Sequence, residues 1–190
     1  MESASPEPSR GRAATHTTGT AIQGPAAADD GPPPRRAAVT APHTVSVVDD
    51  QHPSVDTDRL ATLAHHVLRS LDVPVELELS IACVDRASMA ELNAAHMGTS
   101  GPTDVLAFPI DDVDHVVTGV PGLLGDVVLC PQVAAHQAGD HDRSPRAELD
   151  LLLVHGILHL LGHDHVHADD RDRMFGLTDE LLATFAGGAR

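Results

Sequence analysis

Three histidines near the end of the chain, His155, His159 and His165, are spaced so that they can surround one zinc ion. Residues four apart on an α-helix lie on the same face, so His155 and His159 can both reach a metal at roughly 2.0–2.1 Å. Gly162 can end that helix in the left-handed conformation and reverse the chain, which returns His165 to the same ion. Three protein ligands leave the fourth position on zinc to water, and such a water ionises near pH ~7.

Neighbouring residues leave two details of this site open. His163 or His167 could replace His165 if the turn differs from this picture, and Asp164 could either orient an imidazole or be a solvated turn residue. Fourteen histidines make a pair at helical spacing unsurprising. Three of them with a turn glycine on an apolar helix have no simple structural explanation, because imidazoles facing a core need partners. We therefore predict one Zn²⁺ per chain as the cofactor.

The residue between the first two histidines bears on the class of zinc chemistry. The spacing matches the zinc-peptidase pattern H-E-x-x-H-x-x-G-x-x-H at its metal-binding positions, but Gly156 stands where the Glu general base belongs. Loss of such a base typically costs ~10²- to 10⁴-fold in rate. Peptide hydrolysis is therefore disfavoured, unless a carboxylate from elsewhere, such as Glu148 or Asp126, takes over that role.

The run HGILHLLGHDH at residues 155–165 resembles the signature of the bacterial YbeY family, which is described as a family of rRNA maturation factors and metal-dependent, single-strand-specific endoribonucleases. Two further blocks are similar to that family. One is Leu92 and Asn93 followed by PTDVLAFP at residues 102–109, and the other is GDVV at residues 125–128. The blocks occur in family order, and the similarity covers about residues 44–187.

The resemblance implies a function and further site residues. The expected activity is endonucleolytic cleavage of single-stranded rRNA, in 16S rRNA 3′-end processing and ribosome quality control. The resemblance would place Thr103 and Asp104 at the rim of the active cleft, as substrate-binding residues, although the two could equally cap the loop before Val105.

One position departs from the family pattern. Many members carry an Arg between the Asn and the Pro-Thr-Asp element that is thought to serve RNA cutting, and Met97 stands there in this chain. A thioether cannot replace a guanidinium on a phosphate. Either another Arg contacts the phosphate, with Arg146 and Arg143 the nearest candidates by helix position, or the activity on RNA is weakened. A non-catalytic, zinc-containing ribosome-assembly factor is therefore an alternative function.

Two routes of RNA cleavage are compatible with the predicted site. Zinc would either activate its water or polarise a phosphoryl oxygen against an attacking 2′-hydroxyl. The sequence does not separate the two, and it offers no convincing general base. Beyond the zinc-bound water, the catalytic candidates are Asp164 and Arg146, both weakly supported.

Composition divides the 190 residues into a tail and one domain. Residues 1–42 are rich in Ala, Pro, Gly, Ser and Thr with few large apolar side chains, so we predict a disordered tail, followed by a single zinc-dependent endoribonuclease-like domain at 43–190. The tail lacks the apolar core of a signal peptide, and nothing downstream approaches the ~20 apolar residues of a membrane span. We therefore predict a cytoplasmic protein with no membrane partner.

The charge of the predicted domain is unusual for an RNA enzyme. The tail is formally neutral, so the net charge of −16 falls on the domain. The chain has no Lys, Trp or Tyr and only three Phe, which leaves little for phosphate neutralisation or base stacking. We expect weak intrinsic affinity for RNA. Recognition would then depend on a local patch near the zinc, or on a ribosomal subunit or basic ribosomal protein as partner.

The hydrophobic pattern predicts an α/β (α+β) domain, with a mixed sheet of about four strands packed against five or so helices and a central helix that carries the metal ligands. Predicted strands are 43–48, 74–83, 105–108 and 123–130, and predicted helices are 56–71, 87–96, 132–138, one that begins at Ser144 and Pro145, and 169–185. Alternating polar residues predict that strand 74–83 is an edge strand, and helix 169–185 is expected to cover a remaining face of the sheet. Cys83 and Cys130 are predicted to be buried, reduced thiols.

Overall fold

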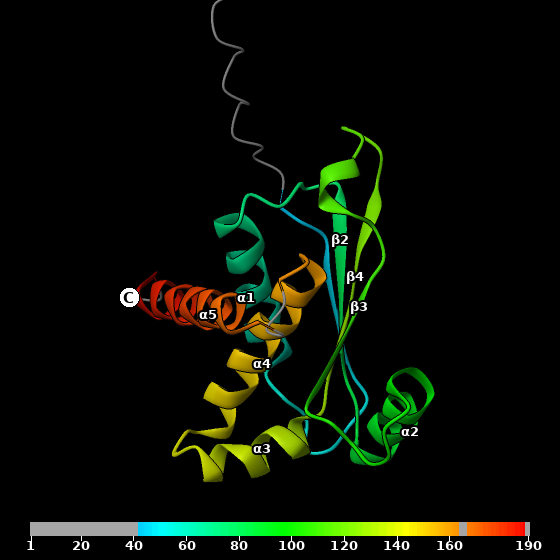
Figure 1. The fold of residues 1–190 in the computed structure, drawn as a ribbon, viewed down its shortest axis with the longest axis vertical. Coiled ribbons are helices and arrows are strands. Elements are labelled where there is room, and N and C mark those ends of the chain that lie inside the picture. The colour runs from blue at the N-terminus through cyan, green and yellow to red at the C-terminus, as the bar shows by residue number, and fades with distance from the viewer. Residues whose placement is uncertain (1–41, 164–166, 189–190) are drawn as a thin grey trace, which may run out of the picture. The chain divides into compact units, whose positions relative to one another are not determined.

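A mixed sheet of four strands runs through the part of the chain that the computed structural model describes, residues 42–163 and 167–188 (Figure 1). The strands are β1 (Val45–Asp49), β2 (Leu77–Cys83), β3 (Val105–Pro109) and β4 (Gly122–Leu129), in the spatial order β1-β2-β4-β3. β1, β2 and β4 are parallel, and β3 pairs antiparallel with β4 at one edge. The predicted mixed sheet is confirmed.

The described residues also form five α-helices. They are α1 (Thr57–Ser70), α2 (Arg86–Met97), α3 (Pro131–Asp140), α4 (Pro145–Leu160) and α5 (Ala168–Gly188), with a 3₁₀ turn at Val113–His115. α1 is the crossover between the parallel strands β1 and β2. α1, α4 and α5 lie on one side of the sheet, and α2 lies at one end of the other side (Figure 1). None of the helices in the described ranges is both long enough and apolar enough to cross a membrane.

Helix α4 is the central helix, as predicted. The Ser144 Oγ accepts a hydrogen bond from the Ala147 N–H at 3.2 Å, and Pro145 occupies the first helical position, where its missing N–H costs nothing. The helix packs against α1, α3, α5, β3 and β4. Because neighbours surround it on nearly every side, its buried residues show no single apolar stripe.

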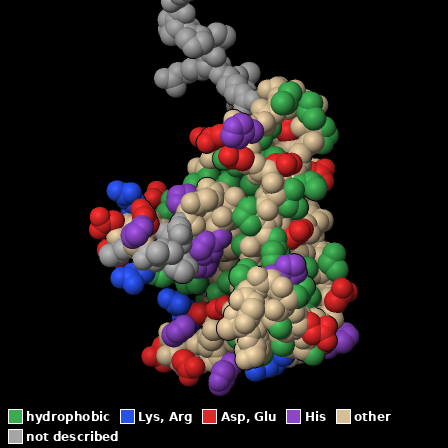
Figure 2. All heavy atoms as spheres, turned by 45° about the vertical axis from the view of Figure 1, so that its right-hand side comes forward, with side chains coloured by type: hydrophobic (Ala, Val, Ile, Leu, Met, Phe, Trp, Pro, Cys, Tyr) green, Lys and Arg blue, Asp and Glu red, His purple; other side chains and the backbone are tan. Residues whose placement is uncertain are grey.

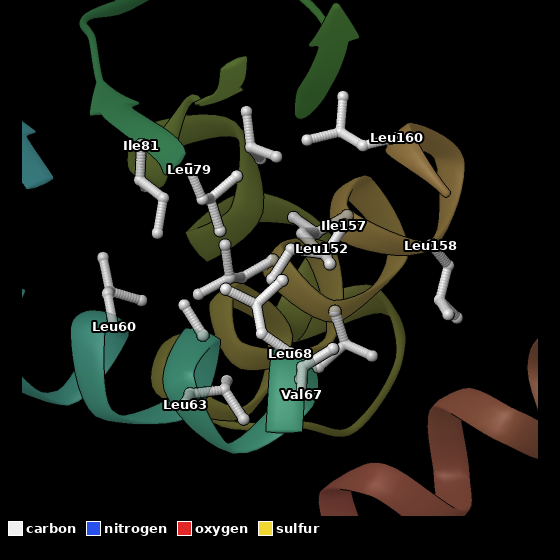
Figure 3. Packing of buried hydrophobic residues seen from close by; sticks show 14 of the residues in the cluster. Leu60, Leu63, Val67, Leu68, Leu79, Ile81, Leu152, Ile157, Leu158 and Leu160 are labelled. Atoms are coloured by element: carbon white, nitrogen blue, oxygen red, sulfur yellow. The ribbon is translucent and has the colours of Figure 1, made fainter. Parts of the chain in front are cut away.

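The main hydrophobic core lies between α1, α4 and one face of the sheet (Figure 3). α1 turns a stripe of leucine and valine side chains toward the sheet, and β2 and α4 meet it with side chains that are almost completely buried. The labelled members are Leu60, Leu63, Val67, Leu68, Leu79, Ile81, Leu152, Ile157, Leu158 and Leu160. This packing holds α4 rigidly, and α4 carries the candidate metal ligands.

Strand β2 is not an edge strand, so that prediction is wrong. β2 lies between β1 and β4 and pairs in parallel with both. Its alternate residues, Glu78 and Ser80, are half-buried on the face of the sheet that α1 and α4 do not cover. α2 covers only one end of that face, and Val48 on β1 stays 50% exposed there. Polar alternation therefore marks a wet face of this sheet and says nothing about a free edge.

Helix α5 also differs from expectation, because its main contacts are with α1 and α4 and not with the sheet. Met174 and Leu181 are buried against those helices, and the His66 Nε2 on α1 hydrogen-bonds the Leu181 carbonyl at 3.2 Å. α1 and α4 already cover this side of the sheet, so α5 forms an outer layer (Figure 1). The predicted tail lies outside the described residues apart from residue 42, and the domain boundary there stays a prediction.

The two cysteines are free and fully buried, as predicted. Cys83 ends β2 and Cys130 follows β4. Burial raises the pKa of the Cys83 thiol to about 12, with the Asp49 carboxylate adding to the effect, and burial also raises the pKa of Cys130. Neither thiol forms the thiolate needed for attack at neutral pH.

We therefore expect neither cysteine to react with iodoacetamide in the native protein at pH 8, because both thiols stay protonated and out of reach of solvent. Mass spectrometry of the alkylated chain is the measurement. The denatured chain, treated identically, should take up two labels. Rapid native labelling of either thiol would contradict the buried placement.

Candidate metal centre

An open cleft of about 900 Å³ lies beside α4. Its lining comes from α4, from β3 and the loop before it, from α5, and from the ends of α2 and α3. Side chains far apart in the sequence thus surround one hollow. His155 and His159 both line it, so the predicted metal ligands face a space that a substrate can enter.

His155 and His159 are arranged as two ligands of one metal ion. Their Nε2 atoms are 3.2 Å apart, the ring centroids are 4.7 Å apart, and the ring planes are nearly perpendicular at 89°. Two nitrogens on a tetrahedral zinc, each about 2.05 Å from the ion, lie about 3.3 Å from one another. The helical spacing of four residues therefore produces the separation that zinc requires, and the pair fits the predicted cofactor.

The third predicted ligand, His165, lies outside the described residues, as does Asp164. Among residues 42–163 and 167–188, no group of three or more His, Cys, Asp or Glu side chains could hold a metal ion. His163 lines a different hollow, with Leu71 and Val113, and is not placed as a substitute ligand. The ligand role of His165 therefore stays a prediction.

The predicted turn after the metal helix is confirmed. Gly162 has φ +82°, the left-handed region that glycine adopts without strain. The His163 N–H donates to the Leu158 carbonyl at 3.0 Å and the Gly162 N–H donates to the His159 carbonyl at 3.1 Å, which is the hydrogen-bond pattern of a Schellman motif. The helix therefore ends at Leu160, one residue beyond His159, and Gly162 lies in the turn that follows.

Gly156 is required by the packing of α4 on the sheet. A Cβ atom at this position would lie 2.7 Å and 3.3 Å from the two methyl groups of Val127 on β4, and 3.2 Å from Val105 on β3. The position next to His155 thus faces the sheet at close range, and a Glu side chain has no space there. The absence of the peptidase general base, noted from the sequence, has a steric cause.

Neither of the two carboxylates considered as substitutes for that base is placed to act as one, although Glu148 lines the same cleft as the histidines. Asp126 lies on β4, and its side chain is on the opposite face of the sheet from Val127, which α4 covers. Glu148 is only 3% exposed and accepts hydrogen bonds from His141 and Arg143, both at 3.1 Å. It precedes His155 by seven residues, about 10 Å along the helix axis. The structure gives no support to a zinc peptidase.

Thr103 and Asp104 line the cleft, where the resemblance implied that they would be, and they immediately precede β3. The Asp104 Oδ1 accepts hydrogen bonds from the Thr103 hydroxyl at 2.9 Å and from the Val105 N–H at 2.8 Å. The Asp104 carbonyl accepts a hydrogen bond from the Cys130 N–H at 2.8 Å. The capping role is thus shown, and the substrate-binding role stays a proposal.

The residues of the other family block hold the loop at the mouth of the cleft. Asn93 is buried, and its Nδ2 donates to the Gly101 carbonyl at 2.8 Å, which fixes the loop between α2 and β3. Met97, at the position of the family Arg, lines the cleft and is 52% exposed. The missing guanidinium thus leaves an apolar side chain on the cleft wall.

The two arginines named as replacements differ in position. Arg143 lines the cleft, but it forms an ion pair with the buried Glu148 at 3.1 Å. Arg146 lines a separate hollow between α1 and α4 and lies 3.9 Å from Asp56. Of these two, only Arg143 is placed near a substrate in the histidine cleft.

The model of the family described as Endoribonuclease YbeY matches residues 46–186. The chain belongs to the YbeY family. It is 47% identical over 143 residues to the Endoribonuclease YbeY of Thermobifida fusca, and the alignment covers 74% of this chain and 92% of that protein. It is 45% identical over 150 residues to the Endoribonuclease YbeY of Salinispora tropica, and the alignment covers 75% of this chain and 96% of that protein.

A solved structure supports the fold of this YbeY family member. The solution structure of TM1509 from Thermotoga maritima is similar with a TM-score of 0.55 and 23% sequence identity, over 77% of this chain and 92% of that chain. The family membership and the mixed α/β fold inferred from the sequence are both confirmed.

The cleft residues that were not found from the sequence include Arg171 and Phe175 on α5. They are four residues apart, so they share a helix face, as the two metal ligands do. This spacing was a usable signal. What the sequence could not supply was the position of α5, because α5 was expected against the sheet and not across the cleft from β3.

We expect Gly156→Ala to lower the free energy of unfolding by about 1–2 kcal/mol, because overpacking against Val127 outweighs the better helix propensity of Ala. Denaturant unfolding is the measurement. Gly176→Ala on α5 is the matched control, since a Cβ there meets nothing within 4 Å, and it should leave stability equal or higher. In combination with Val127→Ala, the cost of Gly156→Ala should shrink. Strictly additive costs would contradict the steric explanation.

Proposed function

We propose that this chain is a zinc-dependent endoribonuclease that cleaves single-stranded RNA in rRNA maturation, at the 16S rRNA 3′ end, and in ribosome quality control. The relatives named Endoribonuclease YbeY align with this chain over most of their own length. The single observation that carries the proposal is the pair of imidazole nitrogens 3.2 Å apart in an open cleft. The cleft has a volume of about 900 Å³ and is lined by polar and apolar groups together.

Zinc would be held by His155, His159 and His165. A zinc ion there supplies Lewis-acid chemistry to a phosphodiester group. The chain itself holds the first two imidazoles in place, because α4 is buried on nearly every side and its last turn is closed by the Schellman motif. Ligands fixed before the substrate arrives need little reorganisation during the reaction.

The substrate would enter between β3 and α5. Thr103 and Asp104 line the β3 side, where the Thr103 hydroxyl oxygen can still accept a hydrogen bond from a ribose hydroxyl. Arg143, 44% exposed at its side chain, lies at the α3 end of the cleft and can contact a phosphate while it pairs with Glu148. Arg146 is not carried into this proposal, because it lines the separate hollow.

The charge of the chain favours help from a partner. Twelve basic and 28 acidic residues give a formal net charge of −16. On the face in Figure 2, acidic side chains are spread from top to bottom, whereas the few basic ones lie at the left and lower edges. Such a surface repels free RNA. We propose that a ribosomal subunit or a basic ribosomal protein in the cytoplasm presents the RNA strand to the cleft.

We expect the double variant His155→Ala/His159→Ala to lose bound zinc and to cut single-stranded RNA about 10³-fold or more slowly, because the Lewis acid is gone. Metal analysis of the purified protein and cleavage of free rRNA and of ribosomal particles are the measurements. Both rings are only half-buried, so circular dichroism should show an intact fold.

His136→Ala, on the exposed side of α3, is the matched control and should keep both zinc and activity. A folded double variant that retains the wild-type rate would refute catalysis at this site. It would leave the non-catalytic assembly factor as the function.

A further inference from the structure

Helix α5 presents one face to the cleft beside the candidate metal ligands. Arg171, Phe175 and Asp179 follow one another at intervals of four residues and all line the cleft. The Phe175 ring is 48% exposed and stacks on the His155 ring, with the centroids 6.2 Å apart and the planes only 17° from parallel. An aromatic face thus lies directly beside the predicted metal position.

Phe175 differs in its surroundings from the other two phenylalanines of the chain. Phe108 packs edge-on against His96 at 4.9 Å and belongs to the second hydrophobic cluster. Phe185 packs against His66, and the Arg59 guanidinium carbon lies 4.9 Å above its ring. Those two rings are half-buried in protein contacts, whereas Phe175 keeps nearly half of its surface open toward the cleft. The stacking residue that the composition seemed to lack is therefore present where RNA would bind.

Arg171 supplies a basic group on the same helix face. It precedes Phe175 by four residues, about 6 Å along the helix axis, a separation that one nucleotide can span. In the described part of the chain no carboxylate lies within ion-pair distance of Arg171, whereas Arg143, Arg146 and Arg173 all have such neighbours. The Arg171 guanidinium can therefore bind a phosphate group without sharing its charge with a neighbouring carboxylate.

The charges along this face of α5 favour one orientation of a bound nucleotide. Arg171 lies one turn before Phe175 and Asp179 lies one turn after it. A phosphate is attracted at the Arg171 end and repelled at the Asp179 end. A nucleotide whose base stacks on Phe175 would therefore have its phosphate toward the start of the helix.

We propose that this face of α5 is the nucleotide-binding wall of the cleft: Phe175 stacks on an RNA base next to the cleavage point, and Arg171 binds a flanking phosphate in place of the guanidinium that Met97 lacks. The inference rests on the proposed endoribonuclease function. It assigns a cationic and a stacking contact to the cleft of a chain whose formal net charge is −16.

The test compares binding and cleavage of a short single-stranded oligoribonucleotide that carries 2-aminopurine, with a 2′-O-methylated version for the binding measurements. Phe175→Leu should weaken binding roughly 5- to 100-fold and should reduce the change in 2-aminopurine fluorescence, because the stacking face is lost. Phe175→Tyr keeps that face and should restore both. Neither change should alter thermal unfolding, since the ring is half-exposed.

Arg171→Gln should weaken binding and make the plot of log affinity against log salt concentration less steep by about 0.7, the value for one phosphate contact on a single strand. Arg173→Gln is the matched control. It removes the same charge from the same helix, but residue 173 is rotated by about 200° from residue 171 and pairs with Asp170 at 3.5 Å. Its salt dependence should equal that of the wild-type chain.

The possible outcomes separate this inference from the proposed function. If the wild-type chain cuts RNA while Phe175→Leu and Arg171→Gln bind it as tightly as Arg173→Gln does, the nucleotide-binding wall is wrong and the endoribonuclease stands. If the wild-type chain binds but does not cut, and the two variants bind weakly, the wall stands and the proposed activity fails. No measurable binding of the oligoribonucleotide by the wild-type chain overturns the wall.

Discussion

The close contact between α4 and the sheet is the constraint on which the rest of the structure depends. Because Gly156 has no side chain, the helix approaches β3 and β4 until its backbone lies against Val105 and Val127. This approach places α4 at the centre of the domain, with α1, α3 and α5 packed around it. His155, the neighbour of Gly156, is thereby held at the junction of helix and sheet, where the cleft opens.

Burial of α4 has an electrostatic consequence, because two of its carboxylates are buried with it. Asp150 is 6% exposed and accepts hydrogen bonds from Arg59 on α1, the shortest at 2.6 Å. Glu148 is paired with Arg143 and His141. An unpaired carboxylate at either position would be strongly destabilising, whereas a paired one fixes the helix relative to its neighbours. The two ion pairs therefore link α1 and the segment before α4 to the same helix that carries the imidazoles.

Local sequence signals predicted the elements and part of the site, because those features depend on residues close together in the chain. The helical spacing of His155 and His159, the cap at Ser144 and the turn at Gly162 each involve a few neighbouring residues, and each is confirmed. Periodicity also identified a buried and a polar face on strand β2. It did not identify which partner covers the buried face, since this depends on pairings across the whole chain. For that reason β2 was misplaced at an edge and α5 was misplaced against the sheet.

The same reasoning explains why the α5 side of the cleft could not be found from composition. Three phenylalanines in 190 residues give a low average supply of aromatic rings, but binding depends on where one ring lies and how much of it is exposed. A net charge of −16 likewise determines the electrostatic potential far from the molecule, which salt screens over about 8–10 Å. The potential within a few ångströms of a bound phosphate depends on the nearest side chains.

The cleft is thus built from two kinds of element. α4 packs against other elements on nearly all sides, so substitutions in it disturb the core. The face of α5 that carries Arg171 and Phe175 is exposed, so its side chains can be changed without loss of the fold. In the proposed site, the metal ligands His155 and His159 and the substrate contacts Arg171 and Phe175 therefore lie on separate helices, so the substrate contacts can be changed while packing holds the ligands in place.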